Sequence, residues 1–178
     1  MTVMFHQKAP AVPVLCLALA LGGVPALAQA DTISGAVDGV ARDWHVLPVD
    51  GVSSARFAGN GMFTMATIFG FPQPSDAGNV TGALELSITL QGQPGAMAAV
   101  DSSVVYYAGG VRQLYLPDPD DPAVTLSLNE SRADDDALFL SGRIEARVHR
   151  VVSITTEELD LSDSHQIEAD FAVTLSPN

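Results

Sequence analysis

Two short runs of aspartate have the spacing that comes closest to a metal site. Asp118, Asp120 and Asp121 lie in a stretch punctuated by Pro119 and Pro122, and three further aspartates follow at 134–136. Calcium takes about six to eight oxygen ligands, and loop carboxylates can supply several of them. Neither run has EF-hand spacing, and Asp and Pro also favour exposed turns for their conformation alone. We therefore expect solvated turns, with calcium binding at Asp118, Asp120 and Asp121 as the alternative.

The histidines and serines show none of the spacings of common catalytic sites. His45, His149 and His165 form no HxH, HExxH or HxxxH motif, and the chain has no G-x-S-x-G sequence. With 21 acidic residues, some pair will lie at a separation suited to glycoside hydrolysis by chance alone. We therefore predict no catalytic residue and no cofactor, and keep a small carboxylate-based hydrolase as an alternative.

The aromatic residues are the other candidates for a binding role. Tyr106 and Tyr107 are adjacent, so a strand would place one ring on each of its faces. Exposed rings on a sheet suit stacking on sugars or docking of a partner. We expect Trp44 and one tyrosine to be buried in the core, because Trp is highly buried on average. The segment Phe69–Pro72 is expected to be a strand end that leads into a loop, and not a binding motif.

Composition and charge exclude several classes of protein. The chain has 178 residues, of which 47% are apolar, so it is long enough for one folded domain and too apolar to be disordered. Its 21 Asp and Glu against 8 Lys and Arg give a formal charge of −13. A surface that binds nucleic acid needs clustered Lys and Arg. Nucleic acid is therefore not an expected partner.

Residues 1–30 have the pattern of a cleaved secretory signal peptide. Lys8 precedes an apolar run from Val12 to Leu27, and the small residues Ala28 and Ala30 flank Gln29. Cleavage after Ala30 would leave a domain of residues 31–178 without Lys, without Cys and without a transmembrane segment. A small secreted module free of disulfides is unusual for an animal extracellular protein. We therefore expect a periplasmic or secreted protein of a bacterial envelope.

From residue 31 onward the sequence alternates between apolar and polar residues with a period of two. This alternation is typical of half-buried strands and is clearest in 81–91, 138–149 and 167–175. Shorter strands are expected at Thr32–Val37, Arg42–Leu47, Ser53–Phe57, Met62–Phe69, Ser103–Tyr107, Val111–Leu116 and Val124–Leu128. Turn residues such as Asp38-Gly39 and Asp50-Gly51 separate them. Thr155–Glu158 has the form of a capping box and predicts one or two helical turns.

The last two long strands, 138–149 and 166–175, are expected to pair antiparallel because they are consecutive. The register favoured by charge places Arg147 opposite Asp170 and His149 opposite Glu168. The same register places Ala146 opposite Phe171 in the core. Gly142 falls on the inward side, which indicates a bulge or a closely packed neighbour.

These patterns predict an all-β fold, an antiparallel β-sandwich of about eight to ten short strands, with a closed soluble β-barrel as the alternative. We expect an exported, non-enzymatic binding or cell-envelope interaction module, whose loops or exposed rings contact a protein, a glycan or a small apolar ligand. A lipocalin-like barrel with an internal apolar ligand is one alternative. A subunit of a surface assembly with a long unpaired edge strand is another.

Overall fold

The protein is built from strands. The computed structural model describes residues 31–59, 62–93, 96–121, 123–134, 136–156 and 158–178. The strands are β1 (Thr32–Val37), β2 (Val40–Val46), β3 (Pro48–Val49), β4 (Val52–Ser53), β5 (Ala55–Gly59), β6 (Phe63–Phe71), β7 (Ala83–Gln91), β8 (Ala98–Val111), β9 (Tyr115–Leu116), β10 (Val124–Asp134), β11 (Ala137–Ser153) and β12 (Glu158–Pro177). The all-β prediction is confirmed. The predicted signal peptide, 1–30, lies outside the described residues.

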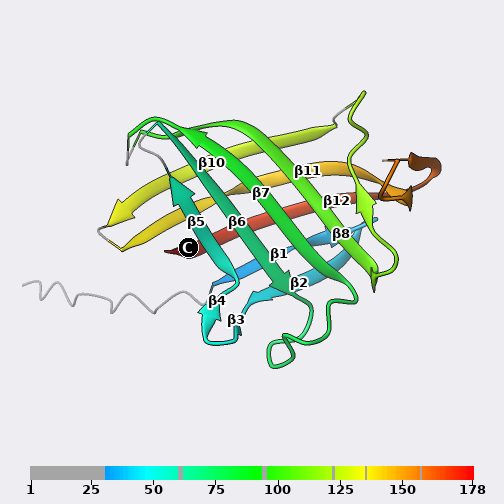
Figure 1. The fold of residues 1–178 in the computed structure, drawn as a ribbon, viewed down its shortest axis with the longest axis horizontal. Coiled ribbons are helices and arrows are strands. Elements are labelled where there is room, and N and C mark those ends of the chain that lie inside the picture. Colours follow the sequence, from blue (N-terminus) through cyan, green and yellow to red (C-terminus); the bar gives the residue numbers. More distant parts are fainter. Residues whose placement is uncertain (1–30, 60–61, 94–95, 122, 135, 157) are drawn as a thin grey trace, which may run out of the picture.

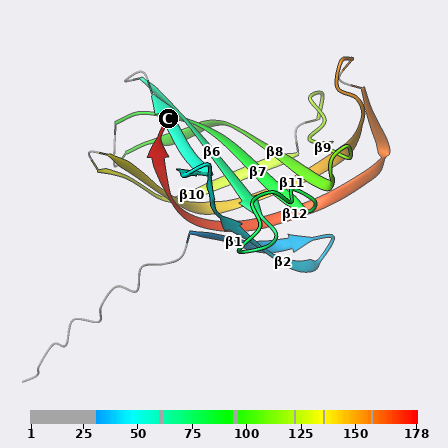
Figure 2. The same ribbon diagram turned by 60° about the horizontal axis from the view of Figure 1, so that its bottom comes forward.

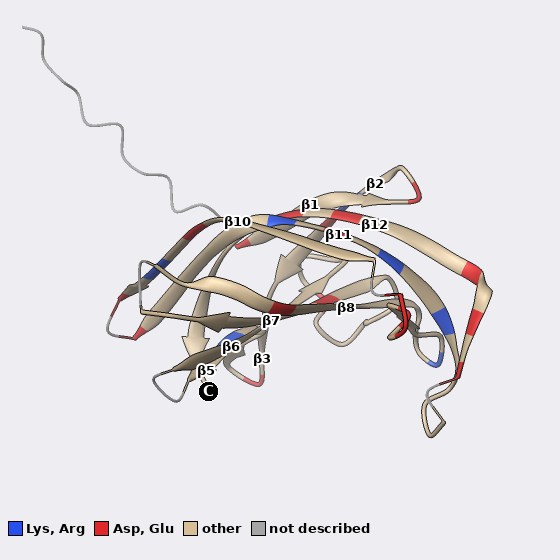
Figure 3. Ribbon diagram, turned by 90° about the horizontal axis from the view of Figure 1, so that it is seen from above, with Lys and Arg blue, Asp and Glu red and all other residues tan. Residues whose placement is uncertain are grey.

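Ten of these strands form one large sheet that folds over on itself (Figures 1 and 2). One layer contains β10, β11, β12, β1 and β2, and the facing layer contains β5, β6, β7 and β8 (Figure 3). The layers join where β2 pairs with β6 through two residues and where the short β9 bridges β8 and β11. They also join where the end of β12 pairs with β5, a parallel pairing in a sheet that was predicted to be antiparallel. The β11–β12 pairing completes the ring. The fold therefore combines the two facing layers of a sandwich with the continuous hydrogen bonding of a barrel.

Several strands are longer than the sequence pattern predicts. The expected segment 103–107 is the central part of β8, which has 14 residues, and the expected segment 124–128 is the first part of β10, which has 11 residues. The added parts of these strands are mostly small or polar residues with little burial, and there the sequence shows no clear alternation of apolar and polar residues. The helical turns predicted at 155–158 are wrong: a turn joins β11 to β12 there, and no helix occurs anywhere in the described ranges. Accordingly, no helix in the part of the chain that the structure describes could cross a bilayer.

The interior between the two layers is filled by side chains. Inward residues of both layers form one cluster that is almost fully excluded from solvent, including Ile33, Leu86, Leu140, Ala169 and Phe171. Acidic residues lie on both layers and at the turns, and do not gather on one face (Figure 3). The period-two pattern thus separates a dry core from a charged exterior.

The β11–β12 pairing is confirmed, but its predicted register is wrong by four residues. Asp170 lies opposite Arg143 and not Arg147, and Phe171 lies opposite Gly142 and not Ala146. A Cβ atom on Gly142 would lie 3.0 Å from Phe171 Cζ and 2.5 Å from the backbone oxygen of Ser127. The absence of a side chain at Gly142 therefore gives the ring its space. A shift of four residues keeps the same faces inward, so the predicted core face is retained.

Charge also fits the observed register. Glu145 lies opposite Glu168, which by itself would be repulsive. The Arg143 guanidinium lies between them and donates to Glu145 Oε1 at 2.8 Å and to Glu168 Oε2 at 2.7 Å. It also donates to Asp170 Oδ2 at 3.0 Å. One arginine thus compensates three carboxylates, an arrangement that pairwise matching of opposite residues does not reveal.

The strand β10 ends the sheet on one side, because β11 is its only strand partner among the described residues. Its pairing with β11 shifts register between Leu128 and Glu130. Such an irregularity is one way in which proteins discourage edge-to-edge association. The surface-assembly alternative therefore gains no support from this edge, and it stays a prediction.

Candidate ligand-binding groove

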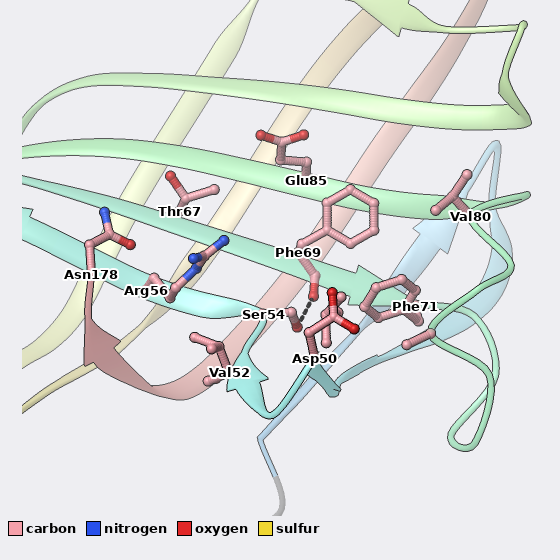
Figure 4. Close-up of a pocket in the computed structure, with 13 residues that line it drawn as sticks. Asp50, Val52, Ser54, Arg56, Thr67, Phe69, Phe71, Val80, Glu85 and Asn178 are labelled. Carbon is pink, nitrogen blue, oxygen red and sulfur yellow. Dashed lines mark hydrogen bonds between the residues drawn. The ribbon is translucent and has the colours of Figure 1, made fainter.

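A groove of about 830 Å³ lies on the outer face of β5, β6 and β7 (Figure 4). Its floor is formed by outward side chains of three neighbouring strands: Arg56 on β5, Thr67 and Phe69 on β6, and Glu85 on β7. Cross-strand pairing sets Arg56 opposite Thr67 and Phe69 opposite Glu85. The groove therefore lies on the side of the sheet opposite to the core.

The walls of the groove come from two irregular segments. The turn between β3 and β4 supplies Asp50, and the chain between β6 and β7 supplies Ala77 and Val80. Asp50 and Gly51 both have positive φ, 53° and 81°, as a tight type I′ hairpin turn requires. Ser54 fixes this hairpin to the sheet: its hydroxyl donates to the Phe69 carbonyl at 2.7 Å and accepts from the Leu47 amide at 3.1 Å.

Phe69 and Phe71 line one end of the groove, and Tyr107 packs against Phe69 from the neighbouring strand β8. Phe69 lies between the other two, with its centroid 4.8 Å from that of Phe71 and 5.3 Å from that of Tyr107. The planes of these pairs are tilted by 50° and 56°, so the three rings do not form a flat platform. Phe71 is buried, whereas Phe69 and Tyr107 are half-buried and keep exposed surface.

Glu85 places a carboxylate against these rings. The Tyr107 hydroxyl donates to Glu85 Oε2 at 2.7 Å, from the neighbouring strand β8. Burial, and next the hydrogen bond to Glu85, raise the pKa of Tyr107 well above its ordinary range. The phenol therefore remains a proton donor at physiological pH, and it fixes the orientation of the carboxylate.

The other end of the groove is polar. Figure 4 places Arg56 together with Thr67 and Asn178, away from Phe71 and Val80. In the described part of the chain Arg56 has no carboxylate within ion-pair distance. The groove thus offers an aromatic and acidic end and a basic and amide end, a combination that suits a small amphipathic ligand.

The aspartates predicted as a metal site lie elsewhere, in the loop between β9 and β10. Asp118 Oδ1 accepts from the Asp120 amide at 2.9 Å, as in an ordinary Asx turn, and Asp120 and Asp121 are exposed. Among the residues with described positions, no group of three or more His, Cys, Asp or Glu side chains could hold a metal ion. One residue of the second run, Asp135, is outside the described residues. Calcium binding at Asp118, Asp120 and Asp121 stays a prediction.

We expect calcium to have no specific effect on stability. The melting temperature of the purified protein should be the same in CaCl₂ and in NaCl at equal ionic strength, because separately solvated carboxylates respond only to screening. A higher melting temperature in calcium that disappears in the Asp120→Asn variant would instead establish a site in this loop.

The histidines are distributed over three strands and do not converge. His45 lies on β2, His149 on β11 and His165 on β12. His165 Nδ1 lies 2.6 Å from Asp38 Oδ2, and its ring packs on Tyr106 and Tyr115 at one end of the interior. These contacts close the end of the core and leave no histidine at the groove.

The expected burial of the aromatic residues is confirmed. Trp44 is 1% exposed and its Nε1 donates to the Gly82 carbonyl at 2.8 Å. Tyr106 is buried, and Tyr107 lies on the opposite face of β8. Phe69 and Phe71 are at a strand end, as expected, but they also line the groove, although this segment was not expected to be a binding motif. The alternation of inward Ala66, Ile68 and Gly70 would have placed both rings on the outer face.

Comparison with known proteins gives no further guidance: no family model matches the chain, and neither a curated protein nor a solved structure matches it. The functional interpretation therefore depends on the geometry of the groove.

Proposed function

We propose that the protein is an exported, non-enzymatic binding module whose ligand occupies the groove on β5, β6 and β7. The observation that carries this proposal is the group of aromatic rings and polar side chains on the outer face of a sheet whose inner face is fully packed. Phe69 and Tyr107 keep exposed surface on the outer face, so their further burial on ligand binding would contribute to the binding free energy.

The internal-cavity and hydrolase alternatives have no comparable observation in their favour. A lipocalin-like function needs space between the layers, and there the inward side chains of both layers form one packed cluster. A carboxylate-based hydrolase needs two acidic groups arranged about a bond. Asp50 and Glu85 both line the groove, but Asp50 is exposed on the β3–β4 turn and Glu85 is held by the Tyr107 hydroxyl. The groove therefore favours ligand binding without catalysis.

A thermal-shift panel tests the proposal. The purified protein is screened against neutral sugars, small amines, short peptides and apolar alcohols, alongside Thr67→Phe and Thr89→Phe. Thr67 lines the groove, so a phenyl ring there fills it, whereas Thr89 is an outward residue of β7 that does not line it. Both substitutions suit an exposed strand position.

We expect at least one compound to raise the melting temperature of the wild type and of Thr89→Phe but not of Thr67→Phe, because ligand binding to the native state stabilises it. Stabilisation that persists unchanged in Thr67→Phe would place the ligand elsewhere, and no stabilisation by any class would contradict the proposed function.

Export is the second part of the proposal, and the N-terminal pattern supports it. Mass spectrometry of the protein recovered from the envelope or medium of an expressing bacterium should show a chain that begins at Asp31. Recovery of the full 178 residues from the cytoplasm would contradict export.

A further inference from the structure

The carboxylate of Glu85 has a hydrogen-bond donor but no cationic partner. Its Oε2 accepts from Tyr107, and in the described residues no arginine or histidine lies within ion-pair distance of it. The side chain is half-buried beside Phe69 and Tyr107. A carboxylate that is partly removed from water gains most from a bound positive charge.

The rings beside Glu85 are arranged to contact such a charge. The face of an aromatic ring is negative, and ammonium groups bind at corners where several faces converge. Phe69 is the accessible ring that lines the groove: it packs between Phe71 and Tyr107, stays half-buried, and lies opposite Glu85 on the neighbouring strand. Phe71 is only 3% exposed, so Phe69 and Tyr107 are the rings of this group that a ligand can contact.

The remaining charges of the groove are consistent with a cationic ligand. Asp50 on the β3–β4 turn and Glu85 on β7 come from opposite sides of β6, so both can approach one ligand. Arg56 lies at the far end, with Thr67 and Asn178 (Figure 4). The formal charge of −13 adds a long-range attraction for cations.

We propose that the groove binds an organic ammonium ion, with the cationic group against Phe69 and Glu85 and its polar substituent directed toward Arg56 and Thr67. This inference rests on the proposed function, because it identifies the ligand class of the same groove. Phe69 provides the aromatic face, Glu85 provides the countercharge, and Tyr107 positions that carboxylate.

The test compares choline with 3,3-dimethylbutan-1-ol, its uncharged carbon isostere, by NMR titration of the purified protein at constant ionic strength. The two probes have the same shape, so any difference in affinity reports the positive charge. Methyl β-glucoside serves as a third probe for a stacked sugar. The signals followed are the Phe69 ring and the Glu85 amide.

We expect choline to bind at least about fivefold more tightly than its isostere, given the range of cation–π interactions. Glu85→Gln keeps an acceptor for the Tyr107 hydroxyl and removes the negative charge. This variant should therefore bind choline more weakly by a similar factor, with an unchanged affinity for the isostere. Phe69→Leu keeps apolar volume and removes the aromatic ring, so it should also lower the affinity for choline more than the affinity for the isostere. Glu168→Gln on the other layer is the matched control and should change neither affinity.

Equal affinities for choline and its isostere in the groove would overturn the cation inference while leaving the proposed binding function intact. Tighter binding of the glucoside would overturn it in favour of a sugar ligand. If none of the three probes perturbs the groove, the cation inference is again overturned, and the thermal-shift panel separately decides the proposed function.

Discussion

Replacing Phe171 with alanine should lower the free energy of unfolding by about 3–5 kcal/mol, the usual cost of truncating a buried aromatic residue. Phe171 is 3% exposed and lies between Ile33 of β1 and Gly142 of β11. The space created by Gly142 is fitted to this ring, so the truncated side chain would leave a cavity. Urea denaturation followed by circular dichroism measures the loss.

The adjacent residue provides the matched control. Asp170 is exposed and takes part in an ion pair with Arg143 at the surface, where such pairs contribute little. Asp170→Ala should therefore shift the urea midpoint far less than Phe171→Ala. Equal, small shifts for the two variants would show that Phe171 does not lie in the core and would contradict the observed register.

Replacing Trp44 with alanine should cost a similar amount, about 3–5 kcal/mol. The indole is almost fully buried at the point where β2 meets the facing layer through only two residue pairs. Its hydrogen bond to Gly82 joins segments 38 residues apart, so the substitution removes packing and a polar link together. The free energy of unfolding is again measured by circular dichroism, because Trp44 is the only tryptophan and its replacement removes the tryptophan fluorescence signal.

Two further variants separate these contributions. Trp44→Phe keeps most of the packing and leaves the Gly82 carbonyl without its donor, so it should cost about 1–3 kcal/mol. Val40→Ala, on the same strand, alters a residue that is 57% exposed and should have little effect. If Trp44→Ala were as mild as Val40→Ala, the contact between β2 and the facing layer would not contribute to stability.

The fold class and the core face were predictable because burial leaves a period of two in the sequence. β1 was predicted at its observed bounds, and residues 138–149 and 167–175 lie within β11 and β12. The register was not predictable from charge pairs alone. It depends on the space left by Gly142 and on the contacts of Arg143 with three carboxylates, which are properties of the assembled sheet.

The candidate groove was less predictable than the fold. Phe69, Glu85 and Arg56 come from three strands, and only their cross-strand pairing brings them together. No spacing along the chain encodes this proximity. The aspartates at 118–121, by contrast, were conspicuous because they are close in sequence, and the structure places them in an ordinary turn.

The central claim is that ligands bind on the outer face of β5, β6 and β7. The most direct test is an NMR chemical-shift map of the labelled protein, titrated with the compound that stabilises it most in the thermal-shift panel. We predict that the largest changes occur at Arg56, Phe69 and Glu85. Largest changes at Leu140 and Ala169, inside the core, would place the ligand between the layers and contradict the claim.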